Sequence, residues 1–96
     1  MKPYSGYMRV TPRALQVKPT EGYRVWVRFE DGLAAEVDFA EMVDRPGYYT
    51  DPLKDPEYFR KVDIYPGGYG IFWPNECDVC PDTLYWRAQQ AVGVAA

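Results

Sequence analysis

The sequence predicts an α+β fold: an antiparallel sheet of about four to five strands, with short helices and a C-terminal helix packed on one face. Two observations predict it. Apolar and polar residues alternate in several short segments, and turn-forming Gly, Pro, Asp and Asn separate these segments. The 96 residues suffice for one modest core. We therefore expect a flexible N-terminal arm over residues 1–12, a single domain over 13–92 and a tail over 93–96.

The predicted strands form two hairpin groups. The first group comprises residues 13–18, 23–29 and 33–39, and the second comprises 62–65 and 70–73. In the first strand Leu15 and Val17 alternate with polar residues, which predicts a shared apolar face.

The strand over 23–29 alternates most clearly and sets the register of its hairpin. Only one register keeps its apolar side chains on the same face as those of the next strand, because a slip of one residue would reverse every side chain. The predicted pairs are Phe29 with Leu33, Val27 with Ala35, and Val25 with Val37. This register leaves a three-residue loop, and we expect Gly32 to adopt a positive φ there as a bulge.

Three helical segments are predicted. Residues 39–43 form a helical turn, and a short helix follows with Asp55 as its N-cap and Pro56 in its first position. Pro81 begins a C-terminal helix that continues to about Ala91. Its expected inner stripe is Leu84, Ala88 and Ala91.

Composition excludes several classes of functional site. The chain has no histidine and two cysteines, so a His-based catalytic pair and a Cys/His zinc site within one chain are excluded. We expect a protein that is not an enzyme and has no cofactor or metal. The apolar runs are too short for a membrane segment and no secretory signal is evident, so we expect a cytoplasmic protein with no membrane association.

Charge is distributed unevenly around a net value of −3. Residues 1–28 hold six basic side chains and one acidic one, whereas residues 29–96 hold five basic and thirteen acidic ones. The basic segment indicates either an anionic partner or pairing with acidic residues on a neighbouring strand.

The most informative stretch covers residues 73–82, with a strand end, a rigid turn, a CxxC and a helix start. Its structural motif residues are Trp73, Pro74, Asn75, Asp78, Pro81 and Asp82. With the paired strands before it and the Leu53-Lys54-Asp55-Pro56 segment, the chain resembles a small bacterial family catalogued as domain of unknown function 2442, over about residues 13–86.

The resemblance implies a compact antiparallel sheet with helices, sometimes fused to a helix-turn-helix and often encoded beside small toxin-antitoxin-like genes. It implies no established catalytic residues. The chain departs from the family at Glu76, where Gly is usual, and at Cys77 and Cys80, where small residues such as Ala are usual.

Cys77 and Cys80 allow two interpretations. A thiol at a helix N-terminus has a lowered pKa, which would suit thiol redox chemistry. Cysteine is also a small hydrophobic residue, and this structural interpretation is favoured because no βαβ pattern precedes the CxxC. The oxygen-bearing side chains of Asn75, Glu76, Asp78 and Asp82 are likewise interpreted as turn and cap residues rather than cation ligands.

Two groups are candidates for binding a partner. Arg24, Trp26 and Arg28 share one strand face, which would suit single-stranded nucleic acid unless Glu36 and Asp38 across the hairpin neutralise the arginines. Exposed aromatic residues form the other group, because tyrosine and tryptophan are enriched at interfaces. Its members are Trp26, Tyr48, Tyr49, Phe72 and Trp86.

We therefore expect a non-catalytic protein-binding or regulatory module, accessory to a toxin-antitoxin-like or larger bacterial complex. Its partner would be another protein or a second copy of the chain. The alternatives are a nucleic-acid-associated regulator that uses the Arg24, Trp26 and Arg28 face, and a thiol redox protein that uses Cys77 and Cys80.

Overall fold

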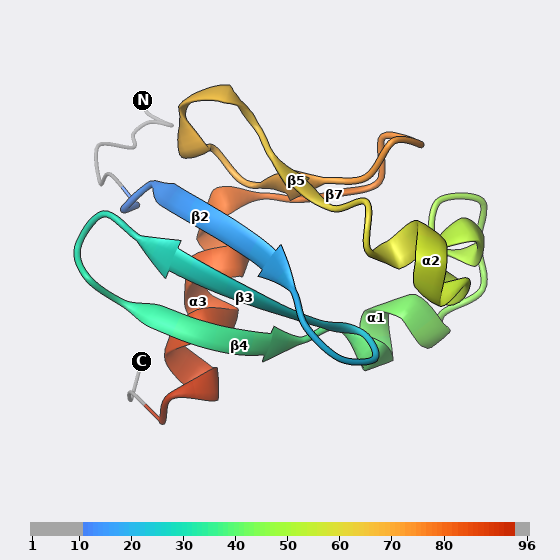
Figure 1. The fold of residues 1–96 in the computed structure, drawn as a ribbon, viewed down its shortest axis with the longest axis horizontal. Helices are drawn as coiled ribbons and strands as arrows, with labels where there is room; N and C mark the ends of the chain where they lie inside the picture. The colour runs from blue at the N-terminus through green and yellow to red at the C-terminus, as the bar shows by residue number, and fades with distance from the viewer. Residues whose placement is uncertain (1–10, 94–96) are drawn as a thin grey trace, which may run out of the picture.

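The computed structural model describes residues 11–93. Most of the expected N-terminal arm, residues 1–10, and the end of the expected tail, residues 94–96, lie outside this range. The described residues form an α+β fold of two three-stranded antiparallel sheets and a C-terminal helix (Figure 1).

The first sheet has the order β2-β3-β4, with β2 over Ala14–Pro19, β3 over Arg24–Phe29 and β4 over Ala34–Asp38. The predicted register is confirmed: Val25 pairs with Val37 and Val27 with Ala35. All four of these side chains are buried, at 5% exposure or less.

The loop between β3 and β4 also has the predicted form. The amide of Phe29 donates to the carbonyl of Leu33 at 2.8 Å, and Gly32 has a φ of 96°. A side chain at Gly32 would meet no atom within 4 Å, so backbone strain alone favours glycine there.

One strand departs from the simple alternation. Ala14 pairs with Phe29 and Gln16 with Arg28, so Leu15 occupies a bulge in β2. An extra residue changes the parity of the side chains that precede it. As a result Ala14 is buried and Leu15 is 50% exposed, which corrects the shared apolar face expected for Leu15 and Val17.

Short helices connect the two sheets. They are α1 over Ala40–Asp44, the 3-10 helix η1 over Asp51–Lys54, and α2 over Pro56–Phe59. The predicted cap of α2 is present, because the side chain of Asp55 accepts a hydrogen bond from the Glu57 amide at 3.1 Å.

The second sheet has the order β5-β6-β7, with β5 over Asp63–Ile64, β6 over Ile71–Phe72 and β7 over Asp78–Val79. A 3-10 turn, η2 over Pro66–Gly68, joins β5 to β6. The predicted second hairpin is thus present, but the single sheet of four to five strands is wrong, since each sheet has three strands.

Two features of β2 disfavour a ladder between the sheets. β5 lies beside β2 but shares no ladder with it. The neighbouring strand β2 contains the Leu15 bulge and ends on Pro19, which has no backbone N–H to donate.

Strand β7 was not predicted. Residues 77–80 alternate in burial, with Cys77 and Val79 buried and Asp78 and Cys80 exposed. This alternation is typical of an extended strand, not of the turn that the CxxC pattern indicated.

The last helix, α3, covers Pro81–Ala91 and lies behind the first sheet in Figure 1. Leu84 and Ala88 are buried as predicted, whereas Ala91 is exposed. The expectation for Ala91 is wrong, and in Figure 1 the last turn of α3 extends past the edge strand β4.

Trp73 lies at the centre of the core, where it is fully buried. Its indole N–H donates to the carbonyl of Phe59 at 2.8 Å, and its ring lies 5.4 Å from that of Phe59 and 6.3 Å from that of Phe39. The packing therefore joins α2, the end of β4 and the end of β6. Across residues 11–93, no helix combines the length and apolar character needed to cross a bilayer.

Candidate functional site

The candidate partner-binding residues fall in three separate parts of the fold. Arg24, Trp26 and Arg28 lie on β3, on the face of the first sheet opposite the buried valines. Tyr48 and Tyr49 lie in the connection between α1 and η1, and Trp86 lies on α3. The structure does not bring these groups together.

The arginines of the sheet face already have partners. Arg24 forms an ion pair with Asp38 at 3.7 Å, and Arg28 donates to the side-chain oxygen of Gln16 at 3.2 Å. Glu36 and Asp38 share this face, so its charge is mixed. A mixed face does not favour phosphate binding, which depends on a net basic surface.

The two tyrosines form the most prominent aromatic feature of the described surface. The exposed fractions are 82% for Tyr48 and 52% for Tyr49. Their rings meet edge to face with centroids 5.1 Å apart, a favoured arrangement for aromatic pairs. We call residues 45–51, which carry this pair, the tyrosine loop.

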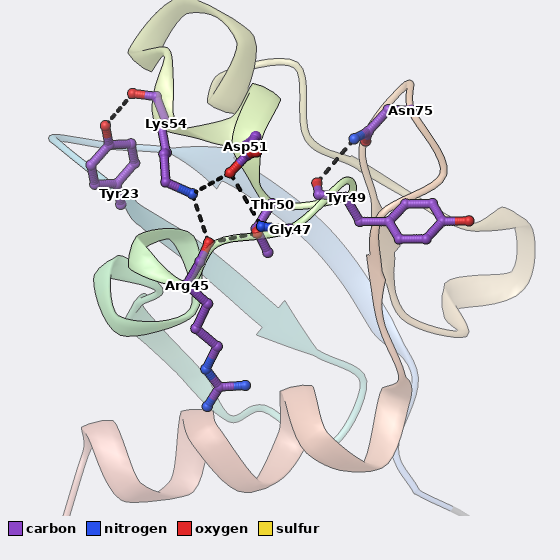
Figure 2. A network of polar contacts seen from close by, with 8 residues as sticks. All are labelled: Tyr23, Arg45, Gly47, Tyr49, Thr50, Asp51, Lys54 and Asn75. Atoms are coloured by element: carbon purple, nitrogen blue, oxygen red, sulfur yellow. Dashed lines mark hydrogen bonds and ion pairs between the residues drawn. The ribbon is translucent and has the colours of Figure 1, made fainter.

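Polar contacts fix the backbone of the tyrosine loop (Figure 2). The carbonyl of Arg45 accepts from the Thr50 hydroxyl and from the Lys54 ammonium, each at 2.7 Å. Across the loop, the amide of Asp51 donates to the Gly47 carbonyl at 2.9 Å, and the Gly47 amide donates to the Asp51 carboxylate at 3.3 Å.

Lys54 also connects the loop to the sheet. Its ammonium lies 3.0 Å from the Asp51 carboxylate, and its carbonyl accepts from the hydroxyl of Tyr23 (Figure 2). The hydrogen bond from Lys54, together with that from the Gly47 amide, lowers the pKa of Asp51. The carboxylate that holds the loop is therefore ionised at neutral pH.

Asn75 joins the tyrosine loop to the Trp-Pro-Asn turn. Its side-chain amide donates to the Tyr49 carbonyl at 3.0 Å (Figure 2). Its side-chain oxygen accepts from the Cys77 amide at 3.2 Å. One side chain thus orders both its own turn and a loop 26 residues earlier. Sequence reasoning predicted the structural role of Asn75 but missed this second contact.

A surface hollow lies beside Tyr49. Its other lining residues are Glu76, Cys77 and Asp78. The hollow is continuous with the turn that Asn75 holds, so the tyrosine loop and the turn form one surface.

The remaining structural motif residues lie at element ends. Asp78 accepts a hydrogen bond from the Tyr65 hydroxyl at 2.9 Å, and this bond raises the pKa of Tyr65. Pro81 occupies the first turn of α3, and Asp82 follows it and accepts from the Thr11 hydroxyl. An acidic side chain in the first helical turn is stabilised by the unpaired N–H groups there.

The chain matches the family described as "Protein of unknown function (DUF2442)" over residues 14–90. It belongs to the DUF2442 family. No curated protein and no solved structure matches the chain. The family match extends across both sheets and most of α3, and it assigns no activity.

The first departure from the usual DUF2442 pattern has a conformational consequence. Glu76 has a φ of 73° and is the one non-glycine residue with a positive φ between Thr11 and Gly93. Positive φ is the region that glycine adopts without steric cost. The glycine usual in the family at this position therefore suits the turn better than Glu76 does.

The second departure, the two cysteines, does not favour a redox site. Cys77 is buried, and burial followed by the charge of Asp78 raises the pKa of its thiol. Cys80 is exposed, with its sulfur 3.2 Å from the Thr83 hydroxyl. Residues three apart on a strand face opposite sides with Cα atoms about 10 Å apart, beyond the roughly 4.4–6.8 Å of a disulfide.

Oxygen-bearing side chains near the turn form hydrogen bonds within the protein. Within residues 11–93, no group of three or more His, Cys, Asp or Glu side chains is arranged to hold a metal. Asn75 is engaged by Tyr49 and Cys77, and Asp78 by Tyr65.

Trp86 is 51% exposed on α3, away from the buried side formed by Leu84 and Ala88. Its neighbour Tyr85 instead packs its ring edge to face against Phe29, with centroids 5.0 Å apart. Trp86 is an isolated exposed aromatic residue, and such residues are common on protein surfaces.

Proposed function

We propose that this DUF2442 protein is a non-catalytic protein-binding module that recognises its partner through the tyrosine loop. The observation that carries the proposal is the combination of strong exposure at Tyr48 and Tyr49 with a backbone held by polar contacts on both sides.

Order in the free protein matters for affinity. Each flexible side chain or loop that must be ordered at an interface opposes binding. Tyrosine offers a large contact area with few rotatable bonds, so two tyrosines on a fixed backbone lose little conformational entropy on binding. The hollow beside Tyr49 supplies a concave neighbour into which a partner side chain would fit.

We propose a regulatory role for the same surface, exerted through the partner that it binds. A toxin-antitoxin-like or larger bacterial complex is the setting that we propose for this binding.

Site-specific photocrosslinking tests the proposal. A photoreactive phenylalanine analogue replaces Tyr48 in one variant and Tyr69 in the control, since Tyr69 is 58% exposed but lies in the turn after η2. In native extract we expect a discrete adduct from position 48 and none of the same mass from position 69.

A competition experiment tests whether the crosslinked partner binds through the tyrosine loop. Excess unlabelled wild-type protein should abolish the adduct, and excess Tyr48→Ala/Tyr49→Ala protein should not. Equal competition by both proteins, or no competed adduct at position 48, would refute this use of the loop.

A further inference from the structure

The open face of the first sheet carries an unusual row of side chains. Lys18 on β2 pairs with Trp26 on β3, and Trp26 pairs in turn with Glu36 on β4. Residues directly opposite in an antiparallel sheet point to the same face. The row therefore reads cation, indole, carboxylate across the three strands.

The arginines in the two neighbouring rows already have side-chain partners. Arg24 is paired with Asp38, and Arg28 with Gln16. In contrast, neither Lys18 nor Glu36 lies within 4.0 Å of an opposite charge among residues 11–93. Both are exposed, and Trp26 between them is half-buried. Two strand spacings separate their backbones by about 9–10 Å, and no ion pair joins the two side chains.

This arrangement is complementary to itself. A two-fold axis that lies midway between two facing sheets, passes over Trp26 and runs about 15° from the direction of β3 places β2 of one copy over β4 of the other. Lys18 of each copy then meets Glu36 of its partner, and the two Trp26 rings meet at the centre. From this charge pattern we propose that the protein forms a symmetric homodimer through the open face of its first sheet.

The geometry is compatible with known sheet packing. Facing sheets pack about 10 Å apart with strands crossing at about 30°. The crossing angle displaces the Arg24 and Arg28 rows of the two copies sideways by roughly 3–4 Å. Where the two Arg24 rows face each other, the ion pair with Asp38 offsets the charge of Arg24. Tryptophan is enriched among the residues that dominate interface binding energy, and such residues lie near the centre of the interface.

The interface is small. Three strands of five residues present roughly 14 by 17 Å, about a third of the ~800 Å² that each partner buries in an interface of standard size. We therefore expect a weak dimer with a Kd between about 1 μM and 1 mM. This surface is separate from the tyrosine loop, so the dimer and the proposed partner can fail independently.

Sedimentation equilibrium at concentrations up to about 1 mM tests the proposal. The wild type should show a reversible monomer–dimer equilibrium. Lys18→Glu places two carboxylates together at both symmetric contacts, and Glu36→Lys places two ammonium groups together there. Each single substitution should weaken dimerisation by more than about tenfold, because opposed like charges strongly disfavour association.

Charge exchange provides the decisive control. The double variant Lys18→Glu/Glu36→Lys restores opposite charges at both contacts and should dimerise as the wild type does. An equimolar mixture of the two single variants should form a heterodimer for the same reason. Lys61→Glu has the same charge change as Lys18→Glu but lies after α2, beside Tyr58, and should leave the equilibrium unchanged.

Circular dichroism establishes that each variant is folded. The mixture of single variants should restore dimerisation without any further substitution. A wild type that stays monomeric throughout the range would overturn the proposal. So would single reversals that dimerise normally, or a double variant and a mixture that stay monomeric.

Discussion

Asn75 offers the sharpest test of how the tyrosine loop is held. Its side chain makes two hydrogen bonds, a donation to the Tyr49 carbonyl at 3.0 Å and an acceptance from the Cys77 amide at 3.2 Å. Asn75→Ala removes both. Each such bond contributes about 1 kcal/mol, so the free energy of unfolding should fall by about 2 kcal/mol. For a domain of this size that loss lowers the Tm by roughly 8–16 °C.

A second substitution separates the two bonds. Asn75→Asp keeps an oxygen that can accept from the Cys77 amide but loses the donor to Tyr49. We expect Asn75→Asp to lose about 1 kcal/mol, half the effect of alanine. Measuring both variants in about 1 M salt screens the added charge.

Urea unfolding followed by tryptophan fluorescence gives the free energies, and amide hydrogen exchange over residues 47–51 reports the loop directly. Exchange in the loop should accelerate in both variants, whereas exchange at Cys77 should accelerate in Asn75→Ala only. The reasoning would be refuted if Asn75→Ala unfolded within about 0.5 kcal/mol of wild type, the range of ordinary surface substitutions.

Three further outcomes follow from the structure. Glu76→Gly relieves a positive φ, so the free energy of unfolding should rise by roughly 0.5–1 kcal/mol after the entropy of glycine is subtracted; a fall in stability would contradict the assigned turn. The hydrogen bond from Tyr85 lowers the pKa of Asp31 below its unfolded value, so its stabilisation is present above about pH 4 and is lost as pH falls through the folded pKa. Urea midpoints should therefore decline less steeply below about pH 4 in Tyr85→Phe than in wild type, and identical slopes would argue against the contact. With a thiol reagent, Cys80 should react quickly and Cys77 only on unfolding, since Cys77 is buried and its pKa is raised; two equal rates would oppose the placement of β7.

The sequence predicted those parts of the fold in which one local rule dominates. The register of β3 and β4 follows from side-chain parity and the short loop, because a slip of one residue would turn Val37 to the face opposite Val25 and Val27. The α2 cap at Asp55 is also local, since a cap depends on neighbours within a single turn.

Contacts between distant segments were not predictable in the same way. The bulge at Leu15 depends on how β2 fits against β3, and the alternation of the strand alone does not encode it. β7 has only two residues, and the Cys-x-x-Cys-Pro pattern around it is equally typical of a turn that leads into a helix.

The candidate site shows the same division. The excess of aromatic residues correctly predicted exposure of Tyr48, Tyr49 and Trp86, but it also predicted exposure of Trp26 and Phe72, which are half-buried. The polar frame around the two tyrosines was not predictable, because the bond from Asn75 to Tyr49 spans 26 residues and depends on where the second sheet turns. Partnering of Arg24 by Asp38 was foreseen, since the predicted register places them opposite each other.

The central claim is that Tyr48 and Tyr49 lie on an ordered backbone before any partner binds. Backbone amide order parameters measured by NMR relaxation on the free protein test this claim most directly. We predict values near 0.85 for the amides of residues 47–51, the range of a rigid backbone. Values below about 0.6, the range of a flexible segment, would contradict the account.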